Sequence, residues 1–375
     1  MRIDTVLLKV ASRCNLNCSY CYVYNMGDES WRSLPKRIRP DTQALVIRQL
    51  GGLYHRQDHP FAVVLHGGEP LLIGAARLDG LLAGLRAELP LSCSLSIQTN
   101  GVLITDEILD ICASHGVGLS VSLDGPAEIH DANRLDRRDR PTHAAVVAGV
   151  ERLKSHPSAR ALFSGVLAVV DPLSSPASVY AYFKDLGAPS VDFLYRDGNR
   201  AKLPHGKAAV DSVEYGTWLS AILSLYLADR NPPRIRVLDD MMKLLLGGTG
   251  VKEGVGLTDF GIAVIDTDGS ITKTDTLKSS APGDRFDEPW SVHTHELEEV
   301  VRSPEFTHYH HQQRPTSRVC HECPLLAVCG GGMLTHRYDE QNGYDNPTVF
   351  CADQKFLIAR MQEALEPYLN LPAAA

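Results

Sequence analysis

Residues 14–21 of the chain read Cys14-Asn15-Leu16-Asn17-Cys18-Ser19-Tyr20-Cys21 and directly follow the apolar run of residues 5–10. The cysteines have the spacing C-x3-C-x2-C, which lets one loop place three thiolates around a single metal cluster. A [4Fe-4S] cluster takes one ligand per iron, most often a cysteine thiolate, so three ligands leave one iron open to a small molecule. A zinc loop or a chance grouping is the alternative, and zinc would need a fourth ligand, for which His55 is the nearest histidine.

This loop resembles the hallmark of the radical SAM superfamily, a cysteine triad with an aromatic residue, here Tyr20, before the third cysteine. The resemblance implies that Cys14, Cys18 and Cys21 ligate a [4Fe-4S] cluster whose fourth iron is chelated by S-adenosylmethionine. One electron then cleaves the sulfonium and gives a 5′-deoxyadenosyl radical. An electron donor such as flavodoxin or ferredoxin is implied as a partner.

The composition is that of a globular protein without general affinity for nucleic acid: 44% of residues are apolar, 22% are charged and the net charge is -8. No apolar run reaches about 18 residues, and Met1-Arg2-Ile3-Asp4 leads straight into a strand, so we expect a cytoplasmic protein without signal peptide or membrane association. Seven of the nine cysteines stand in two tight groups, which is typical of metal ligands in a reducing compartment. We expect the other two, Cys93 and Cys112, in the core.

Apolar runs alternate with amphipathic stretches, which predicts parallel strands joined by helical crossovers. Six units are too few to close an eight-fold barrel, so we expect an α/β fold with a partial, TIM-like (β/α)6 barrel, the fold that the radical SAM resemblance also implies. The C-terminal strand ends would form its active face. The predicted strands are residues 5–10, 61–66, 92–98, 118–123, 161–170 and 190–194, and the predicted helices are residues 41–54, 75–89, 106–115, 142–156, 174–186 and 212–229.

The pattern changes after Asn231-Pro232-Pro233, which places a domain boundary near residue 235. We expect the barrel in residues 1–235 and a smaller domain in residues 236–375. Within the latter, two short apolar runs joined by the turn Asp268-Gly269 predict a β-hairpin over residues 261–274.

Polar turns follow the second, third and fourth predicted strands: Gly67-Gly68-Glu69-Pro70, Gln98-Thr99-Asn100-Gly101 and Ser122-Leu123-Asp124-Gly125. Each alone is a common turn sequence, but on successive parallel strands they put donors and acceptors on one rim. The first matches the GGEP motif of radical SAM proteins. The resemblance implies that this motif meets the ammonium group of the cofactor's methionine, and that the ribose or carboxylate is contacted from the next two turns. The residues implied are Gly67, Gly68, Glu69, Thr99, Asn100 and Ser122.

A second cysteine group, Cys320-x2-Cys323-x5-Cys329 with Cys351 further on, resembles the SPASM extension of radical SAM enzymes that act on peptides. The four cysteines fill one SPASM ligand set, which implies one auxiliary [4Fe-4S] cluster. The second set is missing, because Met333 and Thr274 stand at positions of its cysteines. A structural zinc site is the rival, and it would make the chain a zinc-stabilised, peptide-binding protein.

Residues 330–338, Gly330-Gly331-Gly332-Met333-Leu334-Thr335-His336-Arg337-Tyr338, directly follow Cys329. Together with Cys323-Pro324 and the missing second set, they resemble the radical SAM/SPASM maturases that build three-residue cyclophanes (triceptides) in ribosomally made peptides. The resemblance implies abstraction of a β-hydrogen from a precursor peptide and a C–C bond from that β-carbon to an aromatic ring. The alternative is a sulfatase-type maturase that oxidises Ser or Cys to formylglycine, against which the missing second set argues.

Two further residues have open roles. Arg134 is a candidate clamp for the cofactor's carboxylate, because guanidinium pairs bidentately, or it is one arginine of the charged loop of residues 134–140. Asp275 follows the hairpin position at which sulfatase-maturing relatives carry a cysteine. In those relatives the next residue is an aspartate that acts as the catalytic base. Asp275 is either the catalytic base that takes a proton from the substrate or a solvated hairpin residue.

Overall fold

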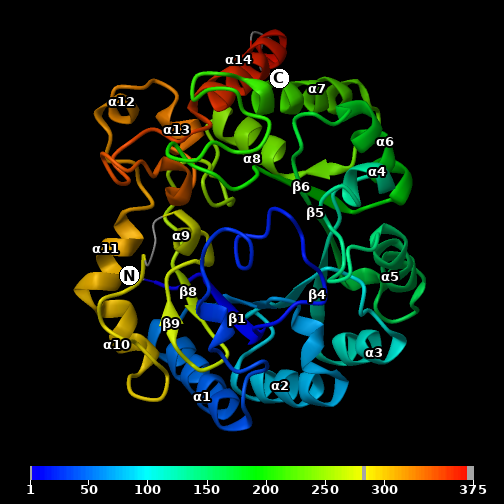
Figure 1. Ribbon diagram of the computed structural model, residues 1–375, viewed down its shortest axis with the longest axis vertical. Helices are drawn as coiled ribbons and strands as arrows, with labels where there is room; N and C mark the ends of the chain where they lie inside the picture. The colour runs from blue at the N-terminus through cyan, green and yellow to red at the C-terminus, as the bar shows by residue number, and fades with distance from the viewer. Residues whose placement is uncertain (1, 281–283, 370–375) are drawn as a thin grey trace, which may run out of the picture. The chain divides into compact units, whose positions relative to one another are not determined.

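The computed structural model describes residues 2–280 and 284–369 (Figure 1). The chain divides into two compact units, the first of Met1–Leu167 and Phe260–His311, the second of Ala168–Asp259 and Gln312–Ala375. The first unit is therefore discontinuous in sequence, while the boundary near residue 235 stays a prediction. Within the described ranges, no helix combines the length and apolar character needed to cross a bilayer.

The first unit is built on a sheet in the order β5-β4-β3-β2-β1-β8-β9, parallel from β5 to β8. β1 has neighbours on both edges, and its side chains at Val6 and from Leu8 to Ala11 are buried, on both faces, as expected inside a parallel sheet. The strands are β1 (Thr5–Ala11), β2 (Ala62–Gly67), β3 (Leu95–Thr99), β4 (Val117–Ser122), β5 (Phe163–Val169), β8 (Ile262–Ile265) and β9 (Ile271–Thr272), which confirms the first five predicted strands.

Helices cover the outer side of this sheet (Figure 1). The helices that begin at Pro40, Ala75, Asp106 and His143 start within about two residues of their predicted positions. A Pro at the first position marks one start, and Thr105 caps another by accepting from Ile108 N. The helices that begin at Ala127, Asp275 and Pro304 were not predicted. Cys112 on α3 and Cys93 before β3 are fully buried, as expected. The helices are α1 (Pro40–Gln57), α2 (Ala75–Glu88), α3 (Asp106–His115), α4 (Ala127–His130), α5 (His143–Ser155), α9 (Asp275–Ser280), α10 (Leu297–Arg302) and α11 (Pro304–His311).

The predicted hairpin is present, and its first strand also joins the main sheet. β8 pairs antiparallel with β9 and parallel with β1, so the yellow β8 lies beside the blue β1 in Figure 1. Gly261 permits this approach: its carbonyl accepts from the N–H groups of Asp4 and Thr5, and a Cβ at residue 261 would lie 1.8 Å from the carbonyl oxygen of Arg2.

The second unit contains the parallel pair β6 (Ser190–Leu194) and β7 (Arg234–Ile235) and the C-terminal cysteine group. Asp353 is fully buried and accepts hydrogen bonds from Lys207 Nζ at 2.7 Å and Gly216 N at 2.8 Å. These bonds fix the first turn of α14, which begins at Cys351. The helices of this unit are α6 (Pro176–Leu186), α7 (Glu214–Ala228), α8 (Arg236–Leu245), α12 (Arg318–His321), α13 (Leu326–Cys329) and α14 (Cys351–Leu369).

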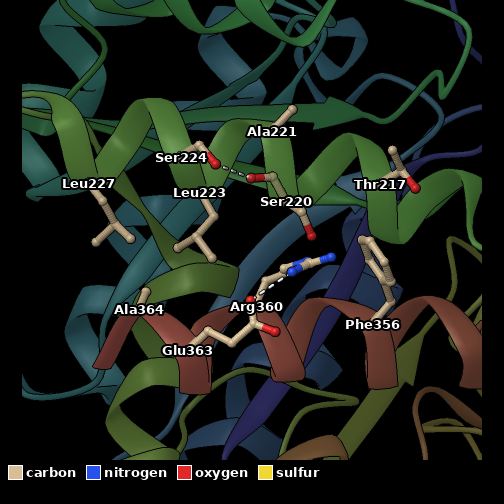
Figure 2. Close-up of a pocket in the computed structure, with 10 residues that line it drawn as sticks. All are labelled: Thr217, Ser220, Ala221, Leu223, Ser224, Leu227, Phe356, Arg360, Glu363 and Ala364. Carbon is tan, nitrogen blue, oxygen red and sulfur yellow. Dashed lines mark hydrogen bonds and ion pairs between the residues drawn. The ribbon is translucent and has the colours of Figure 1, made fainter. Parts of the chain in front are cut away.

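An open pocket lies between α7 and α14 in the second unit (Figure 2). Small and apolar side chains of α7 face Phe356 and Arg360 of α14 across it. Arg360 lies over the Phe356 ring and pairs with Glu363, so its charge is already compensated within α14. This pocket contains none of the residues for which the sequence predicts a role.

Candidate active site

The cysteine loop leaves the carboxyl end of β1 and is held by the segment that carries Arg134. Asn17 N donates to Leu135 O at 2.8 Å, and Ser19 N donates to Asn133 O at 2.9 Å. Arg137 Nε donates to Cys14 O at 2.6 Å. These backbone bonds fix the loop's path while the three cysteines remain half-buried.

The three thiols fit a shared polynuclear centre. Burial raises the pKa of Cys14 to about 12 and that of Cys21 to about 11, and the thiolate of Cys18 adds to both shifts. Three neighbouring thiolates therefore need bound cations to exist at neutral pH, which iron would supply. Asn100 Nδ2 approaches Cys14 Sγ at 3.7 Å and donates to Asn15 Oδ1 at 2.8 Å, so Asn100 orients this first ligand.

The Gly67-Gly68-Glu69 segment continues β2 alongside the start of the cysteine loop. Gly68 N donates to Ala11 O at 2.8 Å and Glu69 N donates to Arg13 O at 2.9 Å. Gly67 has a φ of 136°, and a Cβ there would lie 2.0 Å from Ala11 O. A Cβ on Gly68 would lie 2.3 Å from Arg13 O. Both glycines are required for close backbone contact, whatever they do toward a cofactor.

We expect Gly68→Ala to lower the free energy of unfolding by about 1–3 kcal/mol, because the new methyl group overlaps backbone atoms that cannot move independently. Gly80→Ala is the matched control: Gly80 lies inside α2 with no atom within 4 Å of its would-be Cβ. There alanine should raise stability by about 0.5–1 kcal/mol through helix propensity. Denaturant unfolding measures both variants, and equal stability of Gly68→Ala and wild type would contradict the overlap.

Glu69 is buried and its carboxylate is already held within the chain. Thr99 Oγ1 and Leu71 N donate to Oε1 at 2.7 and 3.0 Å, and Asn100 N donates to Oε2 at 2.8 Å. Burial raises the pKa of Glu69 while these donors oppose the rise. Glu69 thus joins the ends of β2 and β3, as predicted for one rim, and its contact with a methionine ammonium stays a prediction.

Tyr20, Asp124 and Arg134 form a buried polar triad behind the cysteine loop. Tyr20 Oη donates to Asp124 Oδ2, and Arg134 Nη1 donates to Tyr20 Oη at 2.8 Å. Burial raises the pKa of Tyr20, so the phenol remains a donor. Arg134 Nε is buried and has no hydrogen-bond partner among the described residues. An unused buried guanidinium donor fits the predicted clamp for a carboxylate. Arg134 is 7% exposed, so it is not one of the solvated charges of the loop of residues 134–140, and its contact with the cofactor stays a prediction.

Ser122, at the end of β4, accepts a hydrogen bond from Gln98 Nε2 at 3.0 Å. It is half-buried on the same rim as Thr99 and Asn100. A contact of Ser122 with the cofactor stays a prediction.

Asp275 is not a solvated hairpin residue. It opens α9, its side chain is 8% exposed, and it pairs with Lys9 Nζ at 3.0 Å and Lys278 Nζ at 2.8 Å. Lys9 also pairs with Asp266 at 2.8 Å. Burial alone would raise the pKa of Asp275, but the two ammonium groups outweigh it and hold the pKa below its usual range.

The buried group of Lys9, Lys278, Asp266 and Asp275 balances two positive charges with two negative ones. His66 lies across from Lys9 in the β1–β2 register. Burial lowers the pKa of His66, so the imidazole is neutral at neutral pH beside this group. Lys9 was missed from the sequence, although a lysine inside an apolar strand run is a signal of a buried ion pair.

The second cysteine group lies around the start of α14 in the second unit. Burial raises the pKa of Cys329 to about 12, and the thiolates of Cys351, Cys320 and Cys323 add to the shift, so the four sulfurs are neighbours. Cys329 Sγ lies 2.7 Å from the amide oxygen of the buried Gln354. Because oxygen and nitrogen of an amide are interchangeable by a flip, Gln354 can donate to this sulfur when it is a thiolate.

In the described part of the chain, no three Cys, His, Asp or Glu side chains are arranged to hold a single metal ion. A zinc ion needs four ligand atoms about 2.3 Å from one point, whereas a cubane takes one thiolate for each iron. The auxiliary cluster on the second cysteine group stays a prediction.

Arg337 lies beside this second group and was not singled out from the sequence. It is 1% exposed. Burial lowers the pKa of Arg337 to about 10, while the thiolates of Cys320 and Cys329 oppose the fall. A basic residue placed shortly after three consecutive glycines was the available signal.

Residues 8–169 match the model of the Radical SAM superfamily, a stretch that includes the end of β1, the cysteine loop and β2 to β5. This part of the chain is similar to radical SAM proteins. The predicted cofactors, S-adenosylmethionine and a [4Fe-4S] cluster, are thereby confirmed.

Relatives extend the match over most of the chain. It is 25% identical over 357 residues to the serine-type anaerobic sulfatase-maturating enzyme of Bacteroides thetaiotaomicron, covering 88% of this chain and 82% of the relative. The structure of native anSMEcpe with bound AdoMet is similar with a TM-score of 0.81 at 20% identity, covering 98% of this chain and 100% of that one. SuiB of Streptococcus suis bound to precursor peptide SuiA gives 0.63 at 15% identity, covering 93% and 76%. These likenesses confirm the predicted α/β fold with a SPASM-type extension.

Proposed function

We propose that the chain is a peptide-modifying enzyme that removes a β-hydrogen from a residue of a ribosomally made precursor peptide. The observation that carries this proposal is the extent of the sequence match: the likeness to a sulfatase-maturating enzyme covers 88% of the chain, beyond the radical SAM region. SuiB, which shares the fold, binds a precursor peptide. β-Hydrogen removal is common to cyclophane formation and to formylglycine formation, so it does not depend on the choice between them.

We further propose that the product is a cyclophane. Two positions of the second SPASM cysteine set hold other side chains. Met333 packs against Gly254, where a Cβ would lie 2.8 Å from Met333 Cγ, and Thr274 Oγ1 lies 3.3 Å from Thr276 Oγ1. We therefore propose that the chain holds one auxiliary cluster, ligated by Cys320, Cys323, Cys329 and Cys351. Formylglycine formation is the second candidate, favoured by the sequence match to a sulfatase-maturating enzyme.

The chain's own residues would divide the work as follows. Bound at the cysteine loop, the cluster and S-adenosylmethionine supply the 5′-deoxyadenosyl radical. Arg134 would hold the methionine carboxylate through its unused Nε donor. The peptide would lose a β-hydrogen atom to the 5′-deoxyadenosyl radical, which becomes 5′-deoxyadenosine, and the β-carbon would form the bond to the ring. The ring hydrogen would leave as a proton to an Asp275 carboxylate oxygen. The auxiliary cluster, held by the second cysteine group, would supply a one-electron acceptor that an external acceptor reoxidises. Lys9 and Lys278 orient Asp275.

A peptide deuterated at the β-carbon tests the common step. We expect deuterium in 5′-deoxyadenosine and a product that lacks two hydrogen atoms, because the adenosyl radical takes the β-hydrogen directly. Deuterium that is transferred only from an α-labelled peptide would contradict the proposal. The peptide to test is one encoded next to the gene.

The mass change alone does not separate the two products, since oxidation of serine to formylglycine also removes two hydrogen atoms. An aldehyde-reactive hydrazide does: it leaves a cyclophane unlabelled and labels formylglycine. A matched peptide with leucine in place of the aromatic residue should still transfer deuterium but form no crosslink. Labelling of the product by the hydrazide would contradict the cyclophane proposal and support formylglycine formation.

A further inference from the structure

Arg337 is buried without a carboxylate partner. Its Nε donates to Gly331 O at 3.0 Å, its Nη1 to Gln312 O at 3.0 Å, and its Nη2 to Gln313 O and to Gly332 O, the latter at 2.6 Å. All four acceptors are backbone carbonyls, and within residues 2–280 and 284–369 no acidic side chain pairs with it. The guanidinium is thus hydrogen-bonded, but its charge is not balanced.

The turn that receives Arg337 is built for this contact. Gly330, Gly331 and Gly332 have φ angles of 67°, 80° and 69°, a run of left-handed residues that only glycine adopts at low cost. A Cβ on Gly330 would lie 2.0 Å from Gly256 O, so close packing also excludes a side chain there. The turn directly follows Cys329 and directs carbonyls of Gly331 and Gly332 to the guanidinium, so the charge is fixed next to a cluster ligand.

A buried, unbalanced charge is destabilising unless an opposite charge lies near it. The groups that interact electrostatically with Arg337 are the thiolates of Cys320 and Cys329. A cubane with four thiolate ligands carries a net negative charge, since the thiolates outweigh the iron–sulfide core. Each added electron makes that charge more negative, and a fixed cation stabilises the reduced form more than the oxidised form.

We propose that Arg337 is the buried counter-ion of the auxiliary cluster and raises its reduction potential. This inference rests on the auxiliary cluster of the proposed function. It makes the cluster a better acceptor for the electron that the crosslinking step releases. Arg337 acts through the cluster and is a positioning residue, so the readout that tests it is a potential.

The experiment uses the full chain with Cys14, Cys18 and Cys21 replaced by alanine, in which only the auxiliary cluster can assemble. After anaerobic reconstitution, a redox titration followed by electron paramagnetic resonance gives the potential. We expect Arg337→Met to lower the reduced-to-oxidised ratio at a fixed potential by about tenfold, which is about 59 mV for one electron. Arg318→Met is the matched control, because that arginine is two residues from Cys320 but its side chain is 88% exposed, and its charge is screened by water.

Each outcome has a consequence. Equal potentials for Arg337→Met and the parent would overturn the inference while leaving the auxiliary cluster in place. Iron for a single cubane in the wild-type chain, about four atoms in place of about eight, would remove the auxiliary cluster itself. If the Arg337→Met variant does not assemble the auxiliary cluster, the Arg337→Lys variant decides between charge and packing. Cluster assembly in Arg337→Lys shows that the positive charge is needed. Failure of both variants to assemble the cluster assigns Arg337 a packing role and overturns the inference.

Discussion

Replacing Cys14, Cys18 and Cys21 together by alanine should abolish formation of 5′-deoxyadenosine from S-adenosylmethionine. The three thiolates are the only cysteine ligands in that loop, and an open iron exists only where three of four irons are held by the protein. The four cysteines of the second group would saturate the proposed auxiliary cluster and leave no site for the cofactor. The measurement is chromatography of reaction mixtures containing dithionite as reductant.

The complementary variant provides the control. With Cys320, Cys323, Cys329 and Cys351 replaced, cofactor cleavage without peptide should persist, and iron should fall by about half. The triple variant should retain the other half, which demonstrates that it folds. Undiminished 5′-deoxyadenosine from the triple variant would show that the cysteine loop is not the site of cleavage.

Asp275→Asn should slow product formation by about 10²–10⁴-fold while deuterium from the β-carbon still reaches 5′-deoxyadenosine. Asparagine keeps the size of the side chain but cannot accept the proton, and hydrogen abstraction precedes proton loss. The low pKa of Asp275 makes it a weak base, which is sufficient because the ring proton becomes strongly acidic once an electron has left. Mass spectrometry of one reaction mixture quantifies both the crosslinked peptide and the deuterated 5′-deoxyadenosine. The ratio of the two shows whether hydrogen abstraction continues while product formation slows.

Asp266→Asn is the matched control for this variant. It removes the same charge from the same buried group, since Asp266 also pairs with Lys9, but Asp266 is not the predicted base. Equal losses in both variants would assign the effect to charge balance and not to Asp275 as base.

The pH dependence follows from the depressed pKa of Asp275. A carboxylate whose folded-state pKa is lowered stabilises the fold fully above its unfolded pKa of about 3.9 and loses this contribution as the pH falls toward the folded-state value. Asp275 therefore stays ionised between about pH 5 and 8, and its titration should add no acid limb to the rate profile in that range.

The strands β1 to β6 were predictable because each is a short apolar run with polar turn residues after it. The parallel pairing of β8 with β1 was not, since periodicity identifies a strand but not its partner. The helix that begins at Asp275 was missed because the sequence Asp-Thr-Leu-Lys-Ser-Ser of α9 is too short for a helical period.

The two cysteine groups could be identified from their spacing, since metal ligands cluster in sequence as well as in space. The electrostatic partners were not. Lys9 and Asp266 are separated by 257 residues, and Tyr20 meets Asp124 across 104 residues. Such pairs depend on strand order and side-chain burial, which no local pattern contains. Arg337 was missed for another reason: its hydrogen-bond partners are backbone carbonyls, which every residue has, so the sequence does not identify them.

The pairing of β1 with β8 has a consequence for the order of synthesis. Until the ribosome has made Ile262–Ile265, one edge of β1 has no neighbour, and an open apolar edge strand is a template for aggregation. Lys9 would also lack both of its counter-ions, Asp266 and Asp275. Closing so long a loop is slow, so the nascent chain needs protection over most of its translation. We therefore expect that residues 8–169, although they carry the superfamily match, do not fold as a unit of their own.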